Sequence, residues 1–107
     1  MLLSTTDTLQ SIEIRQYLGI VTAEVVYGSN ALRDFFAGIR DIIGGRTGAY
    51  ERVFEQGQRE AMQELENRAR KLGADGVIGI SLQTGTINID ESGVLLLITA
   101  SGTAVKW

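Results

Sequence analysis

Apolar and small residues recur at steps of three and four positions through residues 48–72, which is the spacing of one helix face. The face consists of Tyr50, Val53, Phe54, Gly57, Ala61, Leu65, Ala69 and Leu72. This pattern predicts a single long helix, roughly 36 Å in length at 1.5 Å per residue. We expect Thr47 to cap its N-terminus, Glu51 to lie in its first turn and Gly73 to follow its C-terminus in a left-handed conformation.

A shorter helical pattern precedes this one at residues 31–43. Its apolar positions are Leu32, Phe35, Phe36, Ile39, Ile42 and Ile43. Ser29 or Asn30 can cap the start of the helix, because a side-chain oxygen there accepts a hydrogen bond from a free N–H group. Gly44 and Gly45 end it, so the sequence predicts two helices that are separated by a glycine-rich loop.

Four other segments favour strands by their apolar and β-branched residues. They are residues 2–5, residues 12–27, residues 76–84 and residues 94–106. Residues 88–93 have the sequence NIDESG, which is typical of a turn. Gly79 interrupts the third segment, so we expect a bulge or a close backbone approach there.

Two of the strand segments are apolar on both faces. Residues 94–98 are apolar at five consecutive positions, and residues 20–27 repeat this pattern with Thr22 and Glu24 as interruptions. Because successive side chains of a strand point to opposite faces, both faces of these strands favour burial. Two helices can cover only one face of the sheet. We therefore expect a second copy of the protein to cover the other face, and ordinary scattered apolar surface is the alternative.

These elements predict one domain over residues 1–107. Its fold class is α+β, with an antiparallel sheet of about three main strands and two helices packed on one face, in the order β-α-α-β-β. A chain of this length buries roughly two-thirds of its unfolded surface, which supports a modest core.

The composition excludes several kinds of site. The chain has no cysteine and no histidine, which removes disulfides, thiolate catalysis and the ligands that soft metals select. Its net charge of −3 and its pI of about 4.9 are unfavourable for binding nucleic acid or an anionic membrane. The first ten residues carry neither a basic segment nor an apolar run of signal-peptide length, so we expect a soluble cytoplasmic protein.

Five segments of the chain carry a family signature. They are STT at residues 4–6, GIVTAE at 19–24, RDFFAGIRDIIGGRTGAYE at 33–51, LGADGVIGI at 72–80 and SGTAVK at 101–106. In these segments the chain resembles the bacterial YbjQ-like family, also called UPF0145. The resemblance implies a small α+β fold similar to the dodecin-subunit class, and a homopentameric ring. The family carries the description "putative heavy-metal-binding", and its biochemical function is not established.

One departure from the family bears on metal binding. Relatives often have acidic residues in the strand that follows the GAD segment, where this chain has Ser81, Gln83 and Thr84. The first carboxylate after that segment is Asp90. A metal site built on those acids is therefore not expected here.

The loop Gly44-Gly45-Arg46-Thr47-Gly48 opens the long helix and is the first candidate site. Its free N–H groups and the charge of Arg46 suit a carboxylate or a phosphate. Its spacing differs from that of a Walker loop, which ends in Lys-Ser/Thr. A hinge between two helices, with Arg46 paired to a neighbouring subunit, is the favoured interpretation because glycine turns are common.

Charged residues supply two further candidates. Glu24 lies on an otherwise apolar strand, where a carboxylate could serve as a proton donor or metal ligand, although pairing with an arginine is favoured. Arg33 and Arg40 are seven residues apart on one face of the shorter helix and could clamp an anion. Tyr50 and Glu51 complete this group, for which a salt-bridged surface is favoured.

The long helix also carries a set of carboxylates. They are Glu51, Glu55, Glu60, Glu64 and Glu66. Oxygen ligands suit Ca²⁺, Mg²⁺ or Mn²⁺ rather than soft metals. Because these residues alternate with arginines, a solvated face is favoured over a metal site.

No pair of nucleophile and base is visible by spacing, so we expect no enzyme activity, and we expect no cofactor. We predict a ring-forming cytoplasmic protein that associates with itself and binds a small ligand or ion at subunit interfaces. The alternative is a hard-metal or anion-binding protein that uses Glu24, Arg46 and Glu51.

Overall fold

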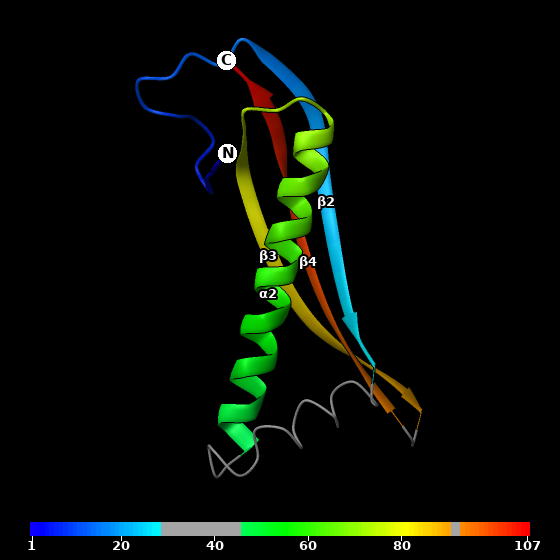
Figure 1. The fold of residues 1–107 in the computed structure, drawn as a ribbon. Helices are drawn as coiled ribbons and strands as arrows, with labels where there is room; N and C mark the ends of the chain where they lie inside the picture. Colours follow the sequence, from blue (N-terminus) through cyan, green and yellow to red (C-terminus); the bar gives the residue numbers. More distant parts are fainter. Residues whose placement is uncertain (29–45, 91–92) are drawn as a thin grey trace.

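The computed structural model describes residues 1–28, 46–90 and 93–107. Its elements are β1 (Leu2–Leu3), β2 (Gln16–Tyr27), α2 (Arg46–Lys71), β3 (Gly76–Asp90) and β4 (Gly93–Lys106). The helix α2 lies lengthwise along one face of the sheet that the longer strands form (Figure 1). The shorter helix predicted at residues 31–43, and with it the candidates Arg33, Arg40, Gly44 and Gly45, lies outside the described residues.

The sheet is mixed and has four strands in the order β1-β3-β4-β2. β2 and β3 each pair with β4 in the antiparallel sense, whereas β1 pairs with β3 in the parallel sense. The predicted arrangement of three antiparallel strands with two helices is therefore wrong, because β1 adds a parallel edge strand and the described residues contain one helix. Only Leu2 and Leu3 pair in β1, and so short a segment has no periodic pattern that could indicate its partner.

The long helix was predicted within two residues at each end. It begins at Arg46 and ends at Lys71, so Thr47 belongs to the first turn instead of capping it, and Glu51 belongs to the second turn. The predicted left-handed residue after the helix is confirmed, because Gly73 has a φ of 83°. Two hydrogen bonds complete the C-cap: Ala74 N donates to Ala69 O at 3.1 Å, and Gly73 N donates to Arg70 O at 2.9 Å.

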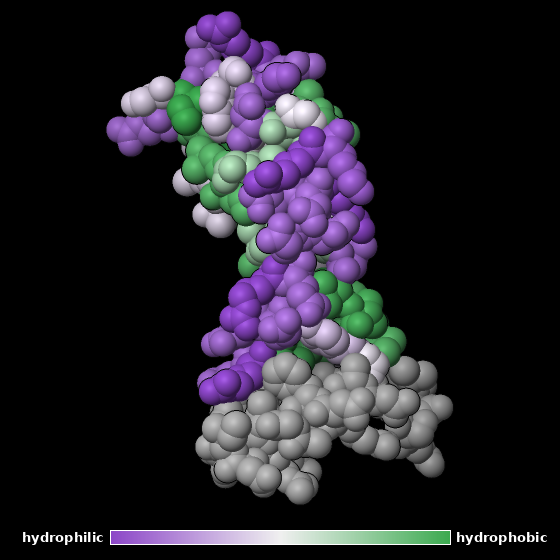
Figure 2. All heavy atoms as spheres, viewed as in Figure 1, coloured by the Kyte–Doolittle hydropathy of each residue, from purple (hydrophilic) through white to green (hydrophobic). Residues whose placement is uncertain are grey.

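The core lies between α2 and the covered face of the sheet. From α2 it takes Val53, Ala61, Leu65 and Ala69, and from the strands Val21, Ala23, Val77, Ile80, Leu96, Ile98, Ala100 and Ala104. Gly57 belongs to the same helix face, and a Cβ at this position would overlap Ile98 Cδ1. The helix therefore approaches the sheet closely at this glycine. On the outer side of α2 hydrophilic residues dominate the surface (Figure 2).

Backbone irregularities occur where glycines interrupt the strands. The pairing of β3 with β4 shifts between Ile78 and Ser81, which confirms the bulge predicted at Gly79. Gly79 has a φ of 60°, and its N–H donates to Thr6 O at 2.8 Å, so the bulge also anchors the N-terminal segment. A second shift lies between Tyr17 and Gly19 in β2.

Two strand boundaries differ from the prediction by more than two residues. β2 begins at Gln16 rather than at residue 12. β3 continues to Asp90, which pairs with Gly93 of β4, so the turn predicted at residues 88–93 is shorter than expected. The polar composition of NIDESG is typical of a loop, but the β-branched residues Thr86 and Ile87 before it favour extended structure, and the strand pairing continues beyond them.

Candidate functional site

The sheet has one face that α2 does not cover, here called the open face. Val21, Ala23 and Ala100 are buried in the core beneath α2, so the side chains that alternate with them point away from the helix. The strand register aligns these side chains in rows across β3, β4 and β2. The rows are Ile78–Thr103–Ile20, Ser81–Ser101–Thr22, Gln83–Thr99–Glu24, Gly85–Leu97–Val26 and Ile87–Leu95.

The open face has a polar middle between apolar ends. The two middle rows, here called the polar rows, contain hydroxyl and amide side chains with Glu24 as their only charged group. Toward the ends, Ile20 is 80% exposed, Val26 is 54% exposed and Ile87 is 50% exposed. Leu95 and Leu97 are half-buried. An exposed apolar surface of this kind is typical of a region that contacts another molecule.

The structure separates the residues predicted to form one site. Glu24 is exposed on the open face, opposite Thr99 of β4. Arg46 and Tyr50 belong to the beginning of α2, as does the exposed Glu51. Because α2 lies on the other side of the sheet, one chain does not bring Glu24 together with this end of the helix.

A hydrogen-bonded group joins α2 to the end of β2. Tyr27 Oη donates to Glu60 Oε2 at 2.7 Å, and Gln56 Nε2 donates to Glu60 Oε1 at 2.9 Å. Burial, together with the hydrogen bond to Glu60 and the charge of that carboxylate, raises the pKa of Tyr27 above its usual range. The tyrosine therefore acts as a neutral donor that fixes the helix to the strand, and not as a base.

Arg68 makes a second contact along the same flank of α2. Its Nη1 donates to the backbone oxygen of Thr22 at 2.6 Å, and its Nε donates to Glu64 Oε1 at 3.1 Å. Sequence patterns did not reveal the contacts of Tyr27 or Arg68 to their partners, since 33 and 46 residues separate the two members of each pair.

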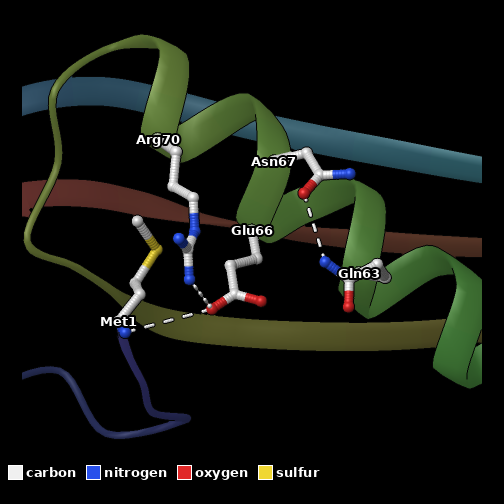
Figure 3. Close-up of polar contacts among 5 residues, drawn as sticks. All are labelled: Met1, Gln63, Glu66, Asn67 and Arg70. Atoms are coloured by element: carbon white, nitrogen blue, oxygen red, sulfur yellow. Dashed lines mark hydrogen bonds and ion pairs between the residues drawn. The ribbon is translucent and has the colours of Figure 1, made fainter.

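Other polar contacts of α2 link neighbouring turns or reach the N-terminus of the chain (Figure 3). Arg70 Nη2 donates to Glu66 Oε1 at 3.0 Å, and the Met1 ammonium lies 4.0 Å from the same oxygen. Gln63 Nε2 donates to Asn67 Oδ1 at 3.1 Å. Glu60, Glu64 and Glu66 are thus engaged with nearby cations, an amide or the Tyr27 hydroxyl, as carboxylates of a solvated face would be.

The donor set of the chain does not fit a soft heavy metal. The sequence offers no sulfur or imidazole ligand apart from two methionine thioethers. Over residues 1–28, 46–90 and 93–107, no group of three or more acidic residues is placed to hold a metal ion. Oxygen atoms of carboxylates, hydroxyls and amides are the ligands that remain, and these suit hard cations.

Two shallow hollows lie beside Met62, which lines both of them. The first, here called the edge hollow, has a volume of about 210 Å³ and is lined by Leu3, Ser4, Thr5, Met62, Ile80 and Leu82. The second has a volume of about 270 Å³ and is lined by Glu55, Gln58, Arg59 and Met62. The lining residues of the edge hollow include two hydroxyl groups but no acid or base. The hollow can therefore contact a bound molecule, but its lining lacks the groups needed for covalent catalysis.

Comparisons with known proteins agree with the sequence signature. A family model described as "Putative heavy-metal-binding" matches residues 1–107. A UPF0145 protein from Trichodesmium erythraeum is 72% identical over 106 residues, which cover 99% of this chain and 98% of that protein. The chain belongs to the YbjQ-like UPF0145 family. A UPF0145 protein from Nostoc punctiforme is similarly 73% identical, with the same coverage of both chains.

The fold of this UPF0145 member also has a solved counterpart. A crystal structure of a protein of unknown function from Pediococcus pentosaceus, assigned to the DUF74 family, matches with a TM-score of 0.66. The match covers 99% of this chain and 96% of that chain at 20% sequence identity, which supports the fold alone. Among the described residues no helix is long and apolar enough to span a membrane.

Proposed function

We propose that this UPF0145 member is a non-enzymatic, ring-forming homo-oligomer of the cytoplasm that binds a small ligand or ion at its subunit interfaces. The observation that carries the proposal is the open face, whose apolar ends stay exposed in a single chain. A second copy that covers Ile20, Val26 and Ile87 would remove these side chains from water, and burial of each is favourable.

The surface area of the chain supports the same conclusion. A single chain exposes 7035 Å², whereas a compact monomer of 11.6 kDa exposes about 5,800 Å². Its radius of gyration is 16.8 Å, compared with about 13 Å for a compact domain of this length. The excess area is comparable to the amount that a specific protein–protein interface buries.

The subunit number and the ring come from the resemblance to the family, which implies a homopentamer. The absence of enzyme activity is proposed because the polar group whose pKa is clearly shifted, Tyr27 with Glu60, holds the helix to the sheet. The cytoplasmic location is proposed from the acidic, cysteine-free composition.

The polar rows favour a second candidate, a protein that binds hard cations. Glu24 presents a carboxylate among hydroxyl and amide oxygens there, which are the ligands of Ca²⁺ and Mg²⁺. A site that also used Arg46 or Glu51 would need those residues from another subunit, because α2 lies on the opposite side of the sheet.

Sedimentation equilibrium and native mass spectrometry of the tag-free protein test the main proposal together. We expect one oligomer at micromolar concentration, and Ile20→Lys or Val26→Lys should shift it toward the monomer. Leu72→Lys is the matched control, since Leu72 is also exposed but follows α2 outside the open face. A single 11.6 kDa species for the parent protein would refute the proposal.

A further inference from the structure

The two ends of the strand order leave long backbone edges without a partner. β2 is the last strand of the sheet. At the other end β1 covers β3 only at its beginning, since the last hydrogen bond from the N-terminal segment reaches Ile80. Every residue from 81 to 87 is exposed. Within the described ranges, the outer sides of β2 and of this part of β3 therefore lack a neighbouring strand.

Neither edge carries the usual protection against strand pairing. Proteins that remain monomeric block exposed strand edges with proline or with charged residues, especially lysine. β3 has no charged residue before Asp90, and β2 has only Glu24. On β2 one backbone acceptor at the edge is already engaged, because Arg68 Nη1 donates a hydrogen bond to the backbone oxygen of Thr22 at 2.6 Å. The composition of both edges is thus suited to pairing.

The strand directions determine how the two edges can meet. β2 and β3 are both antiparallel to β4, so they are parallel to each other. A rotation about an axis along the strands brings β2 of one copy beside β3 of the next copy in the parallel sense. Such a head-to-tail contact uses both edges of every copy and can close into a ring, whereas β3–β3 pairing in a dimer would leave β2 uncovered.

We propose that the uncovered part of β3 binds β2 of a second copy as a parallel neighbour, so that one continuous sheet passes from subunit to subunit. This inference rests on the proposed oligomer and specifies the strand edges that meet in it; the exposed Val26 of β2 and Ile87 of β3 lie on these two edges, so the pairing would bring them to the same junction. Because a rotation about an axis along the strands keeps the rows level, residues 22–27 of β2 would face residues 81–86 of β3, beyond the part of β3 that the N-terminal segment covers.

The edge hollow lies where the pairing of β3 with the incoming strand would begin, next to Ile80 and Leu82. α2 packs over β2 and β4 more than over β3, so Leu82 is left 41% exposed on the helix side of the sheet. The incoming β2, with its own α2 beside it, would cover Leu82 and close the edge hollow. The hollow thereby becomes a site with residues from two subunits, and its apolar lining with two hydroxyls suits a small uncharged molecule.

The absence of cysteine in the chain permits a clean crosslinking test. Glu24→Cys places a thiol on β2, and Gln83→Cys places one on β3, both on the open face. Each variant is treated with a short bis-maleimide alone, after co-expression with the other, and as the double variant. Gln63→Cys on the outer side of α2, paired with Glu24→Cys, is the matched control.

We expect no covalent product from either single variant, a covalent dimer from the co-expressed pair, and from the double variant a ladder that ends at the ring size. A dimer from Gln83→Cys alone would overturn the head-to-tail pairing in favour of β3–β3 contacts. If sedimentation shows an oligomer but the co-expressed pair gives no crosslink, the edge pairing is wrong and the proposed function stands. A monomer would refute both.

Hydrogen exchange of the unaltered protein gives an independent result that needs no variant. The outward-facing amides of residues 22–27 and of residues 81–86 should exchange slowly in the assembled protein, as those of internal strands do. Fast exchange of either segment in the assembled protein would overturn the inference.

Discussion

Replacing Gly57 by alanine tests the close packing of α2 on the sheet. A Cβ at this position would overlap Ile98 Cδ1 and would lie 3.2 Å from Tyr27 Cε2. Ile98 is fully buried, so its terminal methyl group has no solvent space into which it can rotate. The substitution therefore sets a gain in helix propensity against a loss in packing.

The two effects can be compared in magnitude. Alanine in place of glycine in a helix interior stabilises by about 1 kcal/mol. An extra methyl group in a well-packed core costs about 1–3 kcal/mol, and the upper half of that range applies because Ile98 cannot move away. We expect Gly57→Ala to be destabilising by about 1–2 kcal/mol, or roughly 4–8 °C in Tm for each kcal/mol.

The assay is thermal or urea unfolding followed by circular dichroism, at one fixed protein concentration because assembly contributes to stability. Ile98→Val removes the clashing methyl group and should itself cost about 0.5–1.5 kcal/mol. In the double variant the new methyl group fills the vacated space, so the two effects should not add, with a favourable coupling of about 1–2 kcal/mol.

Gln63→Ala on the outer side of α2 is the matched control and should change stability by less than about 0.5 kcal/mol. A Gly57→Ala variant as stable as the parent would refute the close approach. So would strict additivity with Ile98→Val.

Four further predictions concern Gly73, Tyr27 and the binding of soft metals. Gly73→Ala should cost about 1 kcal/mol or more in urea unfolding, because the φ of 83° at the end of α2 strains any residue with a Cβ. Tyr27→Phe should be destabilising by about 0.5–1.5 kcal/mol at neutral pH, because it removes the hydrogen bond to Glu60 Oε2 that joins β2 to α2. The pKa of Tyr27 is raised in the native state, so its protonated hydroxyl contributes fully to the free energy of unfolding below the usual pKa near 10. This contribution is lost as the pH rises through the native pKa. The stability of the parent should therefore fall more steeply than that of Tyr27→Phe above about pH 10. Calorimetric titration of tag-free protein should show no sub-micromolar site for Zn²⁺, Cu²⁺ or Cd²⁺, because the chain lacks cysteine and histidine; a stoichiometric site would contradict this reasoning.

The long periodic elements of this fold could be predicted from the sequence. α2 contains seven of the eight predicted face positions, β4 has an unbroken apolar run, and Gly73 and Gly79 mark conformations that other residues disfavour. These signals are local, so a single sequence contains them in full. The short parallel pairing of Leu2 and Leu3 carries no such signal, because its position depends on the bulge at Gly79 and on hydrogen bonds to distant backbone.

The candidate site was predictable only as a tendency. The apolar character of residues 94–98 indicates that both faces of β4 favour burial, and Leu96 and Ile98 are indeed buried beneath α2 while Leu95 and Leu97 are half-buried on the open face. The rows across that face depend on strand register, which shifts at Tyr17/Gly19, at Ile78/Ser81 and at Asn88/Asp90. Register is a long-range property, and a one-residue error would move Glu24 to the other face.

The proposed strand pairing determines which residues a ligand at the subunit interface would meet. Glu24 belongs to the edge strand β2 and Gln83 to the edge strand β3, whereas Thr99 stays in the middle of each subunit on β4. Under that pairing each junction on the open face receives one carboxylate from β2 and one amide oxygen from β3, with hydroxyl groups from the adjoining polar rows. These are hard oxygen ligands in a region without sulfur or imidazole, so a cation held at the junction would be of the Ca²⁺ or Mg²⁺ kind. Oligomerisation and ion binding would then be linked, since the two ligands at one junction come from different subunits.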